Sequence, residues 1–125
     1  MPVIDHGQDK EIQMRPGIRG QFLANKELGA SQVGLLINTI DPGVNVPLHT
    51  HTVEEVFLIL RGTLWVRIGE ERYTANRQHT VIIPPGTPHA WGTEGPDVSE
   101  VVFAFGGPEP FRDAVYLEGE PPQQV

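Results

Sequence analysis

Glycine and proline are spread along the whole of this sequence, and short runs of Val, Ile, Leu, Phe and Thr stand between them. The 14 glycines and 12 prolines are not gathered into one linker, so no segment has room for a long helix. Apolar and β-branched runs of about four to eight residues, bounded by such turn residues, are typical of strands. The sequence therefore predicts an all-β fold, either an antiparallel sandwich or a barrel.

The expected strands are short and follow one another closely. They cover residues 18–24, 31–40, 46–51, 55–62, 63–69, 71–76, 80–85, 89–93 and 99–105. No internal repeat and no second domain is visible, so residues 1–125 are expected to form a single domain with its core at about residues 33–105. The N-terminal arm or strands (1–32) and the C-terminal arm (106–125) are expected either to fray or to cover an edge strand or a partner subunit.

Charge and residue usage exclude several classes of partner. Nine Lys and Arg residues stand against 16 Asp and Glu residues, which gives a net charge of -7, and no basic patch is visible, so we expect neither nucleic acid nor an anionic membrane as a partner. Cysteine is absent, so a metal would have nitrogen and oxygen ligands only. The start of the chain does not resemble a signal peptide, and no apolar run approaches the roughly 20 residues of a membrane span. A cytoplasmic location is expected.

The stretch HTHTVEE, which begins at His49, places imidazoles and carboxylates directly before an apolar strand. Side chains two apart on a strand share a face, with about 6.6 Å between their Cα atoms, so His49 and His51 can point to one place. If extended geometry resumes after the TVE connection, Glu55 lies on the inward face and Glu54 points to solvent. Buried imidazoles and a carboxylate carry a desolvation penalty that a bound cation relieves. The pattern therefore predicts a metal site.

His89 is the expected further ligand, because it follows the stiff, proline-rich turn IIPPGTP. His6 lies in the N-terminal arm and His79 in the polar run NRQH, where a surface position is the expectation. A site of His49, His51, Glu55 and His89 combines nitrogen and oxygen ligands, which suit several transition metals. We expect one divalent ion per chain, with Mn or Fe favoured and Ni, Zn or Co as alternatives.

These residues resemble the two motifs of the cupin family. The first motif is matched throughout, by Gly43, His49, His51, Glu55 and Gly62. The second is matched at its centre by Pro84, Gly86 and His89, whereas Gln78 and Thr93 stand where the family usually has glycine and asparagine. The resemblance spans about residues 33–105. It implies a small jelly-roll barrel (a double-stranded β-helix) that holds a metal inside and is often built as a homodimer.

The donor set leaves several functions open. Four protein ligands on an octahedral ion leave two positions for water, dioxygen or a chelating substrate, whereas a tetrahedral zinc would be closed. Similar small cupins include dioxygenases, isomerases, lyases and cyclases, and also members that only bind a ligand. We expect a metal-dependent, dioxygenase-like enzyme that acts on an oxygen-rich or aromatic small molecule. An isomerase or cyclase, and a non-catalytic ligand-binding or sensor protein, stay open as alternatives, and no spacing singles out a general acid or base.

Strand parity also indicates which side chains could line a ligand pocket. Trp91 shares a face with His89, Phe57 shares one with Glu55, and Phe103 and Phe105 share a face of the last strand. The expected pocket-lining residues are therefore Asn38, Phe57, Trp91, Phe103 and Phe105. Two other interpretations compete with this one, because aromatic residues of a small barrel often only fill its core, and Asn38 would also suit an exposed sheet face.

Overall fold

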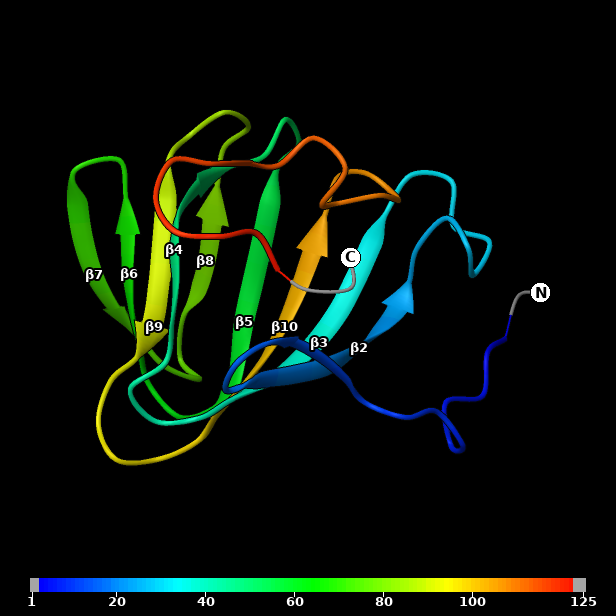
Figure 1. Cartoon of the computed structure of the whole chain (residues 1–125), viewed down its shortest axis with the longest axis horizontal. Helices are drawn as coiled ribbons and strands as arrows, with labels where there is room; N and C mark the ends of the chain where they lie inside the picture. Colours follow the sequence, from blue (N-terminus) through cyan, green and yellow to red (C-terminus); the bar gives the residue numbers. More distant parts are fainter. Residues whose placement is uncertain (1–2, 123–125) are drawn as a thin grey trace.

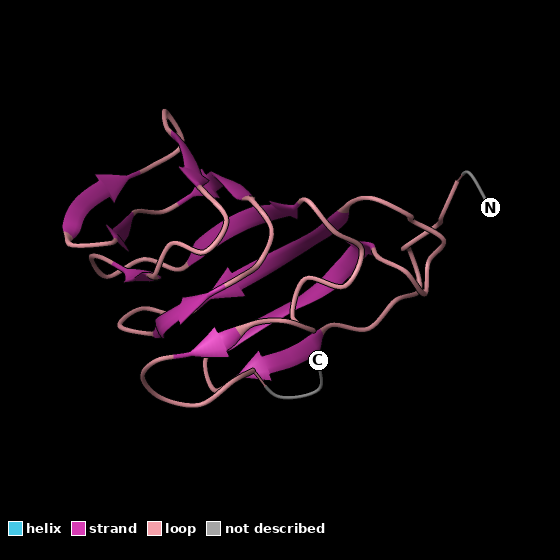
Figure 2. Cartoon of the chain, turned by 90° about the horizontal axis from the view of Figure 1, so that it is seen from above, coloured by secondary structure: helices cyan, strands magenta, loops and turns pink. Residues whose placement is uncertain are grey.

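The structure is a computed structural model that describes residues 3–122, and these residues form strands and loops but no helix (Figure 2). The strands build two antiparallel sheets, one of six strands and one of five (Figure 1). This confirms the predicted all-β jelly-roll class. None of the described residues forms a helix that is long and apolar enough to cross a membrane.

Neighbours in each sheet are mostly distant in the sequence. The six-stranded sheet contains, in spatial order, β1 (Ile12–Arg15), β2 (Ile18–Ala24), β3 (Gly34–Ile40), β10 (Ser99–Phe105), β5 (Glu55–Arg61) and β8 (Thr80–Ile83). The five-stranded sheet contains β11 (Val115–Tyr116), β4 (Asn45–Thr50), β9 (His89–Thr93), β6 (Leu64–Ile68) and β7 (Glu71–Ala75).

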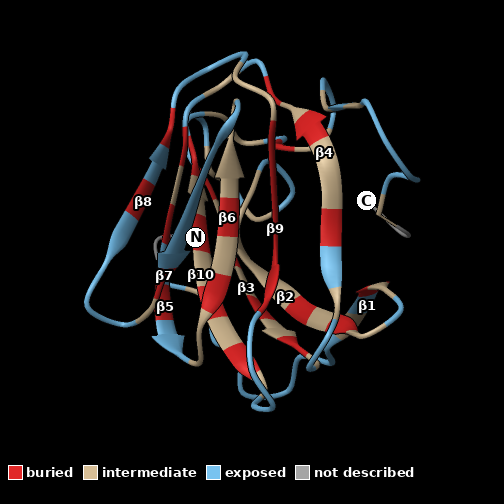
Figure 3. Ribbon diagram, turned by 90° about the vertical axis from the view of Figure 1, so that its left-hand side faces the viewer, coloured by how far each residue is buried: buried red, intermediate tan, exposed pale blue. Residues whose placement is uncertain are grey.

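The core lies between the inner faces of the two sheets. Buried and less buried side chains alternate along β3 and β10, which is the period of a strand with one face inward (Figure 3). Phe57, Leu64, Val66 and Val101 are fully buried. Burial of each such side chain stabilises the fold by about 1.5–3 kcal/mol, so the alternating pattern fixes which face of each strand points inward.

All nine predicted strands are present, and residues 18–24, 89–93 and 99–105 have the predicted bounds. Two strands were not predicted, β1 and β11. Strand β1 forms a hairpin with β2 and extends the edge of the six-stranded sheet. Strand β11 pairs with β4 and covers the edge of the five-stranded sheet. Both terminal segments therefore contribute strands to the sheets.

Candidate metal centre

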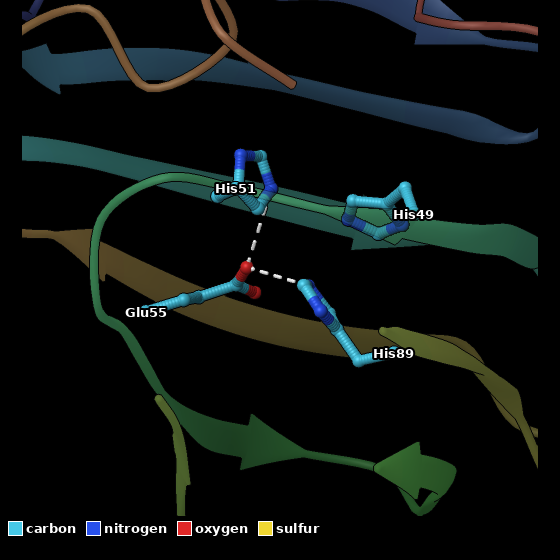
Figure 4. A group of neighbouring side chains, drawn as sticks. All are labelled: His49, His51, Glu55 and His89. Atoms are coloured by element: carbon cyan, nitrogen blue, oxygen red, sulfur yellow. Dashed lines mark hydrogen bonds and ion pairs between the residues drawn. The ribbon is translucent and has the colours of Figure 1, made fainter. Parts of the chain in front are cut away.

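Four side chains that come from both sheets meet between them (Figure 4). His49 lies near the end of β4, His51 follows that strand directly, and Glu55 and His89 are the first residues of β5 and β9. One possible ligand atom from each residue lies within 4.8 Å of those of the other three. Each of the four residues is at most 3% exposed. The structure thus brings together all four residues that were predicted as ligands from the sequence.

Strand register explains how residues far apart in the chain come together. His49 and His89 are direct cross-strand partners of β4 and β9, and their ring centroids are 4.1 Å apart. Glu55 reaches the group from the opposite sheet, where β5 is paired with β10 and β8. Gly86, with φ of 76°, donates its N–H to the carbonyl of His51 at 2.8 Å and so ties the turn before His89 to the end of β4.

Each of the three imidazoles is oriented by a backbone carbonyl. Nδ1 of His49, His51 and His89 lies 2.8 Å from the carbonyl oxygens of Pro47, Pro110 and Thr87, respectively. Because a carbonyl oxygen only accepts, each Nδ1 carries the proton, and in the neutral ring Nε2 keeps its lone pair. A backbone partner of this kind fixes the tautomer of a metal-binding histidine. Nε2 is therefore the nitrogen that each ring can turn to one cation, which at His89 would take the place of the proton donated to Glu55.

The carboxylate of Glu55 compensates the burial of the histidines. Its Oε1 lies 3.0 Å from Nε2 of His89 and 3.4 Å from Nε2 of His51. Burial alone would raise the pKa of Glu55, but the hydrogen bond from His89 and the charges of the histidines bring it below its usual value. Burial pulls the pKa of His89 down, yet the Glu55 hydrogen bond and charge raise it overall.

The other two imidazoles keep the neutral form down to lower pH. Burial, followed by the nearby His89 charge, lowers the pKa of His49 to about 4. Burial also lowers the pKa of His51, although the charge of Glu55 opposes the shift. Neutral imidazole is the form that binds a metal. The donor set of three imidazoles and one carboxylate therefore fits a divalent transition metal.

The remaining candidate side chains lie elsewhere. Glu54 is exposed, as parity predicts for the neighbour of an inward-facing residue. Nδ1 of His6 lies 2.6 Å from Oδ2 of Asp9 at the surface. His79 is exposed, and its Nδ1 accepts the N–H of Asn76 at 3.0 Å. Neither histidine lies with the four clustered residues.

A cavity of about 40 Å³ adjoins the cluster and is lined by His49, His51 and Glu55. Its volume is sufficient for more than one water-sized group, since a single water needs about 10–15 Å³ on this measure. Of the five predicted pocket residues, four line it: Asn38, Trp91, Phe103 and Phe105. Phe57 does not line this cavity. It points inward as expected, but it is fully buried behind Phe103, with 5.0 Å between the ring centroids.

The terminal segments supply further cavity-lining residues, which were not predicted from the sequence. Met14 and Arg15 come from β1, and Phe111 and Tyr116 come from the segment that follows β10. The ring of Phe111 lies 5.9 Å from that of Phe105 and 6.0 Å from that of His51. No motif marks these residues. Only the pairing of β1 with β2 and of β11 with β4 brings them to the cavity.

Thr93, which stands where the second motif usually has asparagine, forms hydrogen bonds to the turn before β4. Its hydroxyl donates to the carbonyl of Asp41 at 2.9 Å, and the N–H of Val44 donates to the same hydroxyl oxygen at 3.2 Å. These bonds hold the turn before β4 against β9. Thr93 therefore ties β9, which carries His89, to the turn that leads into β4, which carries His49.

Comparison with known proteins gives sequence relatives among plant auxin-binding proteins. Auxin-binding protein T92 of Nicotiana tabacum is 32% identical over 79 residues, which are 60% of this chain and 42% of that protein. Auxin-binding protein 4 of Zea mays is 29% identical over 98 residues, 70% of this chain and 48% of that protein. The chain thus spans less than half the length of these curated relatives.

The fold is shared with solved structures at low sequence identity. The polyketide cyclase RemF of Streptomyces resistomycificus superposes with a TM-score of 0.79 and 17% identity, over 96% of this chain and 87% of that one. Oxalate decarboxylase of Bacillus subtilis, in a structure concerned with its Mn(II) centres, superposes with a TM-score of 0.78 and 16% identity, over 91% of this chain and 32% of that one. The sequence model of the cupin domain matches residues 36–105, which contain all four clustered residues. The chain belongs to the cupin family.

Proposed function

We propose that this protein binds one divalent transition metal through His49, His51, Glu55 and His89, with Mn or Fe favoured over Ni, Zn and Co. The observation that carries the proposal is that the three Nδ1 atoms are engaged by carbonyl oxygens, while Nε2 of His89 and of His51 lie 3.0 and 3.4 Å from one carboxylate oxygen and all four residues present a possible ligand atom within 4.8 Å of one another. An arrangement with only a structural purpose would not require three buried imidazoles in the same tautomer around one acid. The Mn(II) centres of the structurally similar oxalate decarboxylase are in keeping with a choice of Mn.

We further propose that the centre is catalytic and acts, in the manner of a dioxygenase, on an oxygen-rich or aromatic small molecule. A metal ion bound here would supply Lewis acidity and positions at which oxygen donors can bind. The side chains of this protein form the cavity that would hold the ligand. Trp91, Phe103 and Phe105 give the cavity an apolar wall that excludes water and favours an apolar or aromatic ligand.

Two observations favour other candidate functions. The superposition on RemF covers most of both chains, which supports a metal-dependent cyclase or isomerase as the second candidate. The sequence relatives are named for auxin binding, which supports a protein that binds a small ligand without converting it. All three candidates use the same metal and the same cavity.

Elemental analysis of the purified protein tests the metal proposal first. We expect close to one equivalent of Mn or Fe per chain, and a protein that retains no divalent metal after growth and reconstitution with either ion would contradict it. Oxygen uptake by the Fe and Mn forms with catechols, flavonols and diketones then tests the reaction. Uptake supports the dioxygenase, turnover of these compounds without uptake supports the cyclase or isomerase, and saturable binding without turnover supports the binding protein.

We also propose that the protein is a homodimer that pairs through the outer face of the six-stranded sheet. Cross-strand partners there form one apolar surface, the outer patch, made of Leu35, Ile37, Val56, Leu58, Ile82, Val102 and Ala104. Leu58 is 43% exposed and Ile82 is 58% exposed. Two chains of net charge -7 repel each other, so a second copy meets the least repulsion where both surfaces are uncharged.

A further inference from the structure

Arg15 differs in its surroundings from the cations of this protein that form ion pairs. Arg19, Lys26 and Arg112 each form an ion pair with a carboxylate at the surface. Arg15 instead lines the cavity beside the clustered histidines, and its Nη2 is buried without a hydrogen-bond partner among the described residues. A buried charged donor without a partner is costly, so this atom calls for an acceptor that the described residues do not provide.

A local irregularity of β1 places this side chain in the cavity. Successive side chains of a regular strand point to opposite faces, so Met14 and Arg15 would not both face inward. The register of β1 against β2 shifts between Gln13 and Arg15, as in a β-bulge. Bulges re-aim a side chain, and here both Met14 and Arg15 line the cavity.

The neighbours of Arg15 hold it there without neutralising it. Its Cζ lies 5.5 Å from the ring centroid of Tyr116, so the guanidinium rests over an aromatic face. On the same cavity, the amide oxygen of Asn38 is also buried without a partner, and Asn38 is only 7% exposed. Within residues 3–122, the cavity thus offers a guanidinium nitrogen of Arg15 and an amide oxygen of Asn38 that have no hydrogen-bond partner, next to the four clustered residues.

We propose that Arg15 binds the carboxylate of a small acidic ligand, whose hydroxyl or N–H group donates to Asn38. The inference rests on the proposed function and narrows its substrate class to carboxylic acids. The divalent ion and Arg15 together would carry more positive charge than the one carboxylate of Glu55 neutralises, so the cavity favours an anionic ligand over a neutral one. The planar guanidinium matches a carboxylate with two parallel hydrogen bonds.

Calorimetric titration with acetate and with its neutral counterpart acetamide tests this assignment. The wild type is expected to bind acetate and to bind acetamide at least about tenfold more weakly, as a lost hydrogen bond to a charged group would imply. The variant Arg15→Gln should bind acetate at least about tenfold more weakly than the wild type does, and it should no longer prefer acetate over acetamide. Arg15→Lys keeps the charge without the fork, so its affinity for acetate should lie between the two.

Arg19→Gln is the matched control, since it removes one arginine from the same hairpin at a side chain that is 43% exposed and paired with Asp41. It should bind acetate like the wild type. Acetate affinity that is equal in the wild type and in Arg15→Gln would overturn the proposal. If Arg15→Gln does not fold, as judged by circular dichroism, acetate affinity equal in Arg15→Lys and the wild type overturns it instead.

Metal content, measured on the same samples, separates this inference from the proposed function. If the wild type contains metal and its affinity for acetate is the same with and without Arg15, the inference about Arg15 is wrong and the metal proposal is supported. If the affinity for acetate depends on Arg15 but the protein contains no metal, the inference is supported and the metal proposal is wrong.

Discussion

The phenol ring of Tyr116 stacks on the imidazole of His49, with 4.8 Å between the ring centroids and 14° between their planes. Tyr116 is also the cross-strand partner of His49 in the pairing of β11 with β4. Burial raises the pKa of Tyr116 to about 12, although the charge of Arg15 opposes the shift, so the phenol is neutral at ordinary pH. The segment after β10 is therefore built into the site.

Removal of the Tyr116 ring should weaken both the fold and the site. Tyr116→Ala should lower the free energy of unfolding by roughly 1–3 kcal/mol, because a partly buried aromatic ring loses its contacts with His49 and Arg15. Tyr116→Phe keeps the stacked ring and should lose less. Urea denaturation of the metal-free protein measures both. Tyr73→Ala is the control, since Tyr73 is 51% exposed on β7 and its loss should change stability by less than about 0.5 kcal/mol.

Glu55→Gln and Glu54→Gln should affect metal binding differently. Glu55 is buried among the three imidazoles and supplies the only negative charge of the group, whereas Glu54 is exposed. We expect Glu55→Gln to weaken metal affinity by more than about tenfold and Glu54→Gln to leave it unchanged. Elemental analysis after dialysis against a weak chelator reads this out. The reverse result would show that the other acid is the ligand.

Stability of the metal-free protein should fall as the pH drops from about 6.5 to 4. The pKa of His49 is about 4 in the folded protein and near 6.5 in the unfolded chain, so the unfolded chain binds more protons in this window. At about 1.4 kcal/mol per pKa unit, His49 alone destabilises the fold by about 3 kcal/mol at pH 4 relative to pH 7. His51, whose pKa is also lowered, adds to the loss.

His89 affects the free energy of unfolding with the opposite sign, but it does not offset the loss of stability between pH 6.5 and 4. Its pKa is raised, so its stabilisation is fully present below about pH 6.5 and is lost only as the pH rises through the folded pKa. Urea midpoints at pH 7, 5.5 and 4.5 in the presence of EDTA measure the dependence. His49→Gln should flatten it, while His79→Gln, at an exposed loop position, should not. A pH-independent midpoint in the wild type would contradict the assignment.

A charge in the outer patch should dissociate the proposed homodimer. Ile82→Lys places an ammonium group at a side chain that is 58% exposed and lies opposite Val56, so it should produce monomers without a large loss of stability. Light scattering during gel filtration gives the mass. Tyr73→Lys, on the edge strand of the other sheet, should leave the dimer intact. A wild type that is monomeric at high concentration would refute the pairing.

The parts of the site that follow from local geometry were predictable from the sequence. His49, His51 and Glu55 stand within seven residues, and a period of two on the strands decides which of them face inward. His89 was predictable because a turn rich in proline and glycine precedes it. The strand 99–105 is an apolar and β-branched run that follows a turn segment, so its bounds were predictable from the sequence, and the structure shows that one of its faces is buried.

The parts that depend on tertiary pairing were not predictable. Strand β1 has four residues and strand β11 has two, which is too short for a periodic signal. Arg15 faces inward because of a register shift that breaks the alternation on which parity arguments depend. For Phe57 the strand period correctly predicts that the side chain points inward. It does not predict whether an inward side chain reaches the cavity, and this ring lies in the core and does not line the cavity.

The carbonyl that orients His51 belongs to Pro110, 59 residues further along the chain. Residues 36–105, which match the family, therefore omit one of the three orienting carbonyls together with Arg15, Phe111 and Tyr116. An expression fragment trimmed to the matched region would keep all four clustered side chains but would lose the cavity-lining side chains that lie outside residues 36–105. The boundaries of a minimal working unit are thus set by these distant partners of the histidines and not by sequence similarity.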